Sequence, residues 1–162
     1  MIITSFPPEP EPPVLSQTSQ YALRTVLQLA SLPRGDRGSA GDLARTVGIP
    51  ANYLSKTLHQ LARAGVVTGT RGKHGGFVLA RPAHRITLAE VVAPFQEVGE
   101  RTCLLGRPAC SDSRPCPAHE QWKAVAERVA GFFSRTTIAD LLASENVKKA
   151  SRRSHGALTA AR

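Results

Sequence analysis

The chain has 162 residues, of which 41% are hydrophobic, and its 21 Lys and Arg residues outnumber its 12 Asp and Glu residues to give a net charge of +9. This composition suffices for one domain with a hydrophobic core, and it excludes a wholly disordered chain. Since no apolar run reaches the ~18 residues of a membrane helix and no secretory signal segment opens the chain, we expect a cytoplasmic protein with no membrane partner.

The first predicted elements are two helices that follow a proline-rich leader. Residues 1–14 hold five of the 12 prolines and are expected to be extended and disordered. Apolar residues at helical spacing predict a helix from Leu15 to Leu32. Ser39 and Asp42 resemble a capping box, which predicts the start of a short second helix that stops at Gly48.

A third helix and a hairpin follow in the basic part of the chain. The helix is predicted from Ala51 to Ala64, with Gly65 as its stop signal. Two β-prone runs, Val66 to Thr70 and Phe77 to Ala80, flank a glycine-rich tip at residues 71–76. Helix, short helix, tight turn, helix and hairpin is the element order of a winged helix-turn-helix. We therefore predict a mainly α fold with a small β-wing.

The second half of the chain predicts a long helix after an irregular loop. A short helix is expected over Thr87 to Phe95, and a loop rich in Gly, Pro and Cys over residues 99–118. A longer helix runs from His119 to about Ser134, and a short one from Thr137 to Ala143. The long helix carries an apolar stripe that fits a dimer contact, although such a stripe also fits packing within one subunit: Trp122, Val125, Ala126, Val129, Phe132 and Phe133.

These elements divide the chain into five predicted parts. The order is a leader (1–14), a DNA-binding domain (15–98), a cysteine loop (99–118), a dimerisation helix with a short C-terminal helix (119–145) and a basic disordered tail (146–162).

The basic residues are concentrated where the predicted DNA-reading elements lie. From Arg45 to Arg85 there are seven Lys or Arg residues and no Asp or Glu. An ordinary solvated helix face is the alternative, but it leaves the coincidence of this acid-free stretch with the winged-helix order unexplained. The candidate DNA-binding residues are Asn52, Tyr53, Ser55, Lys56, Thr57, His59, Arg63, Arg71, Lys73 and His74.

These residues divide into two expected roles. Cationic side chains suit the phosphate backbone, whereas short polar side chains suit base edges or bridging water. The expected phosphate contacts are Lys56, Arg63, Arg71 and Lys73, and the expected base contacts are Asn52, Ser55 and Thr57.

All three cysteines lie in one loop. Cys103, Cys110 and Cys116 fall within 14 residues, and His119 follows three residues after the last. Thiolates and imidazole are ligands that iron–sulfur clusters and zinc accept, so an iron–sulfur cluster is the favoured interpretation. A structural zinc site is the second, because the sequence lacks the usual short CxxC spacing. Metal-free thiols, acting as a redox switch or having no role of their own, are the third. A cysteine-nucleophile enzyme with a small-molecule substrate is not expected.

Taken together, the two halves resemble the Rrf2 family of bacterial transcription regulators, of the IscR and NsrR type. The resemblance runs from about Leu15 to Ala143. The segments that carry it are SQYALR (19–24), YLSKTLHQLARAGVV (53–67), RGKHGGFVLARP (71–82), the three-cysteine loop and TIADLL (137–142). The family implies a homodimeric winged-helix regulator of double-stranded DNA, expected here to be a repressor, in which an iron–sulfur cluster tunes DNA binding in response to redox, nitric oxide or iron–sulfur status.

The resemblance also implies a ligand set. Cys103, Cys110 and Cys116 match the three ligand cysteines, and His119 matches the histidine ligand of the [2Fe–2S] members. Members with a [4Fe–4S] cluster use an acidic ligand at the position of Gln20, which is a poor iron ligand, so the [2Fe–2S] form is favoured and [4Fe–4S] is the alternative. IscR has a glutamate where this chain has Ser55, so its two classes of DNA target are not expected to carry over.

Overall fold

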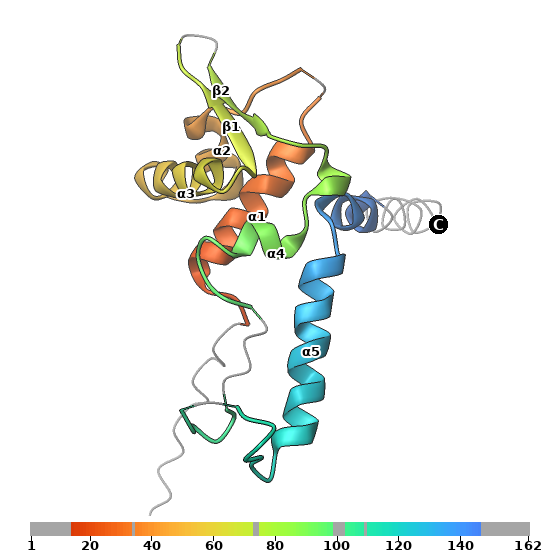
Figure 1. Cartoon of the computed structure of the whole chain (residues 1–162). Coiled ribbons are helices and arrows are strands. Elements are labelled where there is room, and N and C mark those ends of the chain that lie inside the picture. Colours follow the sequence, from red (N-terminus) through yellow and green to blue (C-terminus); the bar gives the residue numbers. More distant parts are fainter. Residues whose placement is uncertain (1–13, 34, 73–74, 99–102, 109, 147–162) are drawn as a thin grey trace, which may run out of the picture.

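The computed structural model describes residues 14–33, 35–72, 75–98, 103–108 and 110–146 (Figure 1). The predicted leader, apart from residue 14, and nearly all of the predicted basic tail lie outside the described residues.

Three helices form the body of the N-terminal half. Helix α1 (Gln17–Ala30) begins where the Ser16 hydroxyl accepts a hydrogen bond from the Ser19 amide, at 3.2 Å. Helix α2 (Ala40–Val47) is capped in the same way by Ser39, as predicted, and ends at a left-handed Gly48 with φ 72°. Such a backbone angle favours glycine, which has no Cβ to clash with the following carbonyl group.

Helix α3 (Ala51–Arg63) separates an apolar face from a polar one. Leu54, Leu58 and Leu61 are fully buried, and together with side chains from α1 and α2 they form the hydrophobic core. Three or four residues separate each from the next, so all three lie on one side of the helix. This stripe therefore faces the core.

The wing is a two-stranded antiparallel sheet of β1 (Val67–Thr70) and β2 (Gly76–Leu79). Its register pairs Val67 with Leu79 and Thr70 with Gly76. Two further backbone hydrogen bonds, between Gly38 and Phe77, join the segment before α2 to the sheet. A Cβ atom at Gly75 would clash with the carbonyl oxygen of Thr70, so the wing turn requires glycine there.

The wing is followed by a 3-10 helix, η1 (Ala83–Arg85), and by the short helix α4 (Leu88–Val92). Thr87 and Glu90 form a reciprocal capping box at the start of α4. The helix ends three residues before the predicted Phe95, and residues 93–95 form turns instead. Pro94 explains the early end, because its ring blocks the continuation of an α-helix.

Helices α1 to α4 and the wing together form the part of the molecule that we call the head. Helix α5 (His119–Arg135) extends away from the head towards the cysteine loop (Figure 1). Its C-terminal end is joined to the head by backbone hydrogen bonds from Leu88 to the carbonyl oxygen of Thr136, at 3.0 Å, and from Ile138 to that of Ile86, at 2.9 Å. Ile138 is fully buried in the core and opens a last helical stretch over residues 138–146. The wing therefore lies at one end of the molecule and the cysteine loop at the other.

The predicted fold class is confirmed, since the described residues are mainly helical with one small antiparallel wing. Within the described part of the chain, no helix combines the length and apolar character that crossing a lipid bilayer would require.

Candidate functional site

The outward face of α3 presents most of the polar side chains predicted to contact DNA. Asn52, Lys56, His59 and Arg63 are exposed, and Ser55 is half-buried. The sequence of α3 contains no Asp or Glu, so no carboxylate on this helix would repel a phosphate backbone.

Thr57 does not belong to this surface. Its side chain is only 1% exposed, and its hydroxyl donates a hydrogen bond to the carbonyl oxygen of Tyr53 at 3.1 Å. Thr57 lies three residues after Leu54 and four before Leu61, so it shares their buried face. The prediction that the Thr57 side chain contacts base edges is therefore wrong.

Tyr53 links α3 to the start of α1. Its ring packs edge-on against Tyr21, with ring centroids 5.6 Å apart, and its hydroxyl is hydrogen-bonded to the Thr18 hydroxyl. These groups border an open groove of about 310 Å³ that is also lined by Lys56 and Phe95. No sequence pattern indicated Thr18, because it lies 35 residues from Tyr53 and in a different helix.

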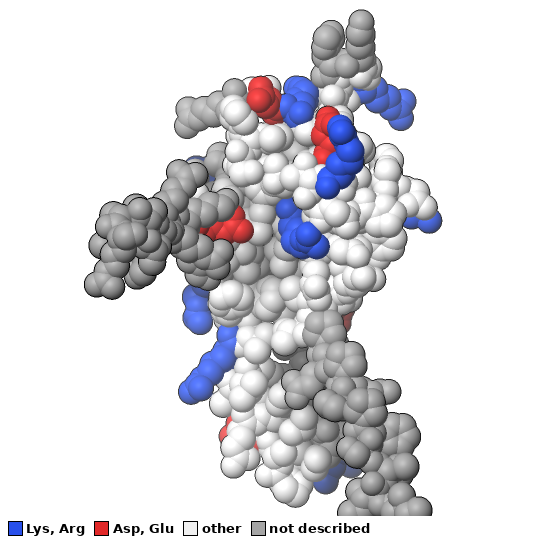
Figure 2. Space-filling model, turned by 180° about the vertical axis from the view of Figure 1, so that it is seen from behind, with Lys and Arg blue, Asp and Glu red and all other residues white. Residues whose placement is uncertain are grey.

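The wing adds further cations at the same end of the molecule. Arg71 is exposed, whereas Lys73 and His74 lie outside the described residues. Arg37, which the sequence analysis did not single out, is also exposed and donates to the Thr70 hydroxyl at 2.9 Å, beside the wing. In the view from behind, Lys and Arg side chains predominate over Asp and Glu among the described residues (Figure 2).

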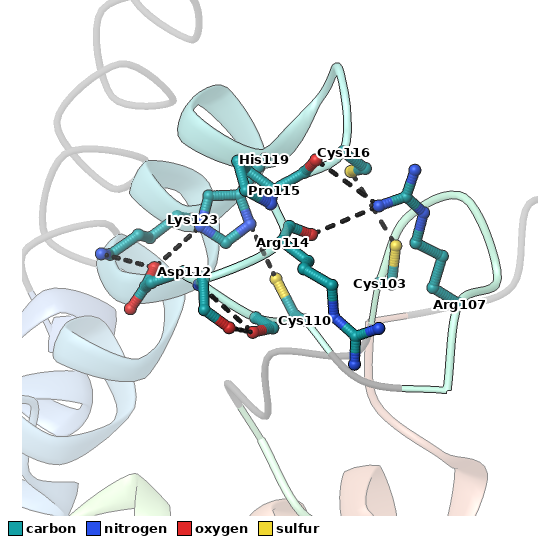
Figure 3. Close-up of polar contacts among 11 residues, drawn as sticks. Cys103, Arg107, Cys110, Asp112, Arg114, Pro115, Cys116, His119 and Lys123 are labelled. Carbon is teal, nitrogen blue, oxygen red and sulfur yellow. Dashed lines mark hydrogen bonds and ion pairs between the residues drawn. The ribbon is translucent and has the colours of Figure 1, made fainter.

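The four predicted metal ligands come together as two pairs at the start of α5 (Figure 3). The Sγ atoms of Cys103 and Cys116 are 3.9 Å apart, and the Sγ atom of Cys110 lies 3.4 Å from Nδ1 of His119. Cys116 and His119 are buried, and Cys103 and Cys110 are half-buried. All three cysteines are free thiols.

Backbone contacts hold the Cys103–Cys116 pair. The Arg107 guanidinium donates to the carbonyl oxygens of Arg114 and Pro115, at 3.3 and 3.4 Å, so it ties the two arms of the loop together. Hydrogen bonds from the backbone amides of Arg107 and Leu105, together with the Arg107 charge, lower the pKa of the Cys103 thiol. A thiol with a lowered pKa is more readily present as the thiolate that binds metals.

Two residues that the sequence analysis missed surround the histidine. Asp112 Oδ1 is 2.8 Å from His119 Nε2 and 3.0 Å from the ammonium nitrogen of Lys123. Lys123 lies one helical turn after His119 on α5, which is a spacing visible in the sequence. Asp112 comes from the irregular loop, so no periodic pattern could have located it.

The donor chemistry fits a thiolate- and imidazole-ligated metal centre, but the two pairs do not converge on one point. Among the described residues, no three His, Cys, Asp or Glu side chains are grouped closely enough to hold a single metal ion.

Comparison with known proteins adds independent evidence. The Rrf2 family model, described as iron-dependent transcriptional regulators, matches residues 15–144. The transcriptional regulator IscR of Escherichia coli O1:K1 is 27% identical over 141 residues, which cover 87% of each chain.

Solved structures show the same fold. CymR, the global cysteine regulator of B. subtilis, matches with a TM-score of 0.70 and 22% identity over 80% of this chain and 96% of that chain. T. potens IscR matches with a TM-score of 0.66 and 21% identity over 81% and 87% of the two chains. The family match over residues 15–144, together with the winged-helix fold, leads to one conclusion: the chain belongs to the Rrf2 family of DNA-binding transcription regulators, which are not enzymes.

Proposed function

We propose that the chain is a homodimeric regulator whose affinity for double-stranded DNA depends on an iron–sulfur cluster bound by Cys103, Cys110, Cys116 and His119. The signal would be redox state, nitric oxide or iron–sulfur status. The observation that carries this proposal is the pairing of the four donors at the free end of α5, the helix whose other end is bonded to the DNA-binding head.

The spacing within each pair supports a [2Fe–2S] cluster. Two thiolates on one tetrahedral metal atom lie about 3.8 Å apart when each metal–sulfur bond is about 2.3 Å, and a thiolate and an imidazole lie about 3.6 Å apart. The observed separations are 3.9 Å for Cys103 and Cys116 and 3.4 Å for Cys110 and His119. Two pairs match two irons with two protein ligands each, whereas a structural zinc ion would need all four donors around one centre.

A bound cluster would supply one-electron redox chemistry. The chain itself supplies the connection to DNA. Cys116 and His119 are joined by a hydrogen bond from the His119 amide to the Cys116 carbonyl oxygen, at 2.9 Å, so ligation there fixes the first turn of α5. Since Ile138 and Leu88 fix the other end to the head, a change in the loop can alter the placement of α3 and the wing. A coupling free energy of about 1–3 kcal/mol would change DNA affinity some 5- to 150-fold.

A second copy of the chain is the proposed occupant of the apolar face of α5. Phe132 is 51% exposed and Val125 is 45% exposed on this helix. Phe132 and Val129 also line an open groove of about 430 Å³ together with Val14 and Leu15. Pairing two chains through this face would place two recognition helices on one DNA site and double the number of phosphate contacts.

The test is anaerobic purification followed by visible absorption, with iron, sulfide and zinc assays on the same sample. We expect a coloured protein with about two irons per chain. Cys116→Ala should lose the colour, while Ser113→Ala, in the same loop, should keep it. Cluster-loaded and cluster-free protein should then bind one operator fragment with different affinities at a fixed salt concentration.

Each measurement can contradict a separate part of the proposal. A colourless protein with stoichiometric zinc would contradict the cluster, and about four irons per chain would contradict the [2Fe–2S] form. Equal DNA affinity with and without the cluster would contradict sensing. In vitro transcription from the same operator would show whether the bound regulator represses.

A thiol switch is the second candidate, because the Cys103 and Cys116 sulfur atoms are already close. Hydrogen peroxide would oxidise the two thiols to a disulfide: the S–S bond forms, the O–O bond breaks, and both thiol protons leave in two molecules of water. A Cys103–Cys116 disulfide in peroxide-treated, metal-free protein, with an accompanying change in DNA affinity, would favour this candidate. Its absence would exclude it.

A further inference from the structure

His119 is buried between two groups of different chemistry (Figure 3). Its side chain is 2% exposed. Nε2 lies 2.8 Å from the Asp112 carboxylate, and Nδ1 lies 3.4 Å from the Cys110 sulfur on the other side of the ring. The orientation of the ring is therefore fixed by one partner at each nitrogen.

Asp112 and Cys110 interact differently with the two ring nitrogens: one requires a hydrogen-bond donor and the other can meet a lone pair. A neutral imidazole has one N–H donor and one nitrogen with a lone pair, and an ionised carboxylate only accepts hydrogen bonds. Asp112 therefore selects the form of His119 that carries its proton on Nε2. The Nδ1 lone pair then points towards Cys110, where the thiol can donate to it in the metal-free protein. A metal can be bound through that lone pair without any change in ring orientation.

Lys123 fixes the carboxylate that makes this selection. Its ammonium group donates to the same Asp112 oxygen, at 3.0 Å. His119 and Lys123 are one turn apart on α5, so two side chains of this helix contact Asp112. Because Asp112 lies only two residues after Cys110, these contacts also bring the Cys110 sulfur to the Nδ1 side of the ring.

We propose that Asp112 is a positioning residue that makes Nδ1 the metal-binding atom of His119, and that Lys123 holds Asp112 in place. The inference rests on the proposed function in that it takes His119 as a ligand of the iron–sulfur cluster. It adds which ring nitrogen binds iron and which residues impose that choice. Outer-shell partners of this kind typically change metal affinity 10- to 100-fold when they are removed.

The first test needs no cluster. Two-bond ¹H–¹⁵N NMR spectra of the full-length, metal-free protein, recorded in mildly basic solution, distinguish the two neutral ring forms. We expect His119 to carry its proton on Nε2, and Asp112→Ala to shift the population towards the Nδ1–H form. Glu120→Gln is the matched control, because it removes an exposed carboxylate next to His119 and should leave the ring unchanged. An Nδ1–H form in the unaltered protein would overturn the inference.

The second test uses the cluster-loaded protein and measures the rate at which a chelator removes iron, followed by the loss of visible absorption. Asp112→Ala should accelerate the loss about 10- to 100-fold, and Asp112→Glu should restore part of the retention. Far-UV circular dichroism of each variant checks that α5 remains folded.

A third variant separates a positioning role from a general role in loop stability. In a His119→Cys background there is no ring to orient, so adding Asp112→Ala should have little further effect on iron retention. An equal acceleration in both backgrounds would show that Asp112 only stabilises the loop, and would overturn the inference. If the unaltered protein binds no iron, the proposed function fails while the NMR result still decides which ring nitrogen carries the proton.

Discussion

Replacing Lys56 with glutamine tests the assignment of the α3 surface as the face that meets the DNA backbone. Lys56 is exposed on the side of α3 opposite to the buried leucines. Glutamine keeps most of the length of the side chain and its helix propensity, so the fold should be unaffected and only one positive charge is lost.

The size of the effect follows from counterion release. Each phosphate neutralised on B-DNA contributes about −0.9 to the slope of log K against log salt. A dimer with two heads loses two such contacts, so the slope should become less steep by about 1.8. Raising the salt concentration from about 50 to about 200 mM weakens DNA binding by both proteins. The factor by which the affinity falls should be about 12 times smaller for the variant than for the unaltered dimer.

The assay is fluorescence anisotropy with a labelled operator fragment over this salt range. Arg114→Gln is the matched control, because it removes the same charge from an exposed position in the cysteine loop, at the far end of the molecule from α3. Its slope should equal that of the unaltered protein. Equal slopes for all three proteins would refute the placement of Lys56 against phosphate, and equal changes in both variants would show that only net charge matters.

Three further predictions concern stability and assembly. Leu58→Ala should lower the free energy of unfolding by about 2–5 kcal/mol in urea titrations, because the side chain is fully buried, and a loss below about 1 kcal/mol would contradict its place in the core. Burial raises the pKa of Glu90, but hydrogen bonds from the Thr87 amide and the Arg81 guanidinium outweigh it and lower this pKa below its ordinary 4.5. Glu90 therefore stabilises the fold above about pH 4.5, and this contribution disappears as the pH falls through the lowered pKa. Glu90→Gln should make the unfolding free energy less dependent on pH in the acid range. An unchanged pH dependence would contradict this prediction. Phe132→Glu should place a charge in the proposed dimer contact and halve the mass found by sedimentation equilibrium, whereas an unchanged mass would rule out that contact.

The helical head was predictable because its signals are local and repeat with the helix period. The leucines of α3 and the caps at Ser39 and Thr87 each depend on residues three or four positions away. The error at Thr57 came from residue type, since a hydroxyl was assigned to the DNA-facing side although its position placed it beside the leucines. Burial is tolerated there because the Tyr53 carbonyl oxygen accepts its hydrogen bond.

The nearness of the four candidate metal ligands was predictable, but their surroundings were not. The closeness of the cysteines and His119 in the sequence indicated that they meet, whereas their division into two pairs depends on how an irregular loop turns. Asp112 reaches His119 because of the same turn, and no periodic pattern encodes it. Arg37 and Thr18 were missed for a related reason, because each meets the DNA-reading elements only through contacts between distant segments.

The backbone hydrogen bonds at Ile86 and Leu88 hold the C-terminal end of α5 against the head, so a movement at the cysteine loop would pivot the helix about this held end. A helix of 17 residues is about 25 Å long at 1.5 Å per residue. Tilting it by about 5° about this held end moves its free end by about 2 Å. Under the proposed coupling, DNA bound at the head would resist movement of the free end, so DNA and the cluster would change each other's affinity by the same factor.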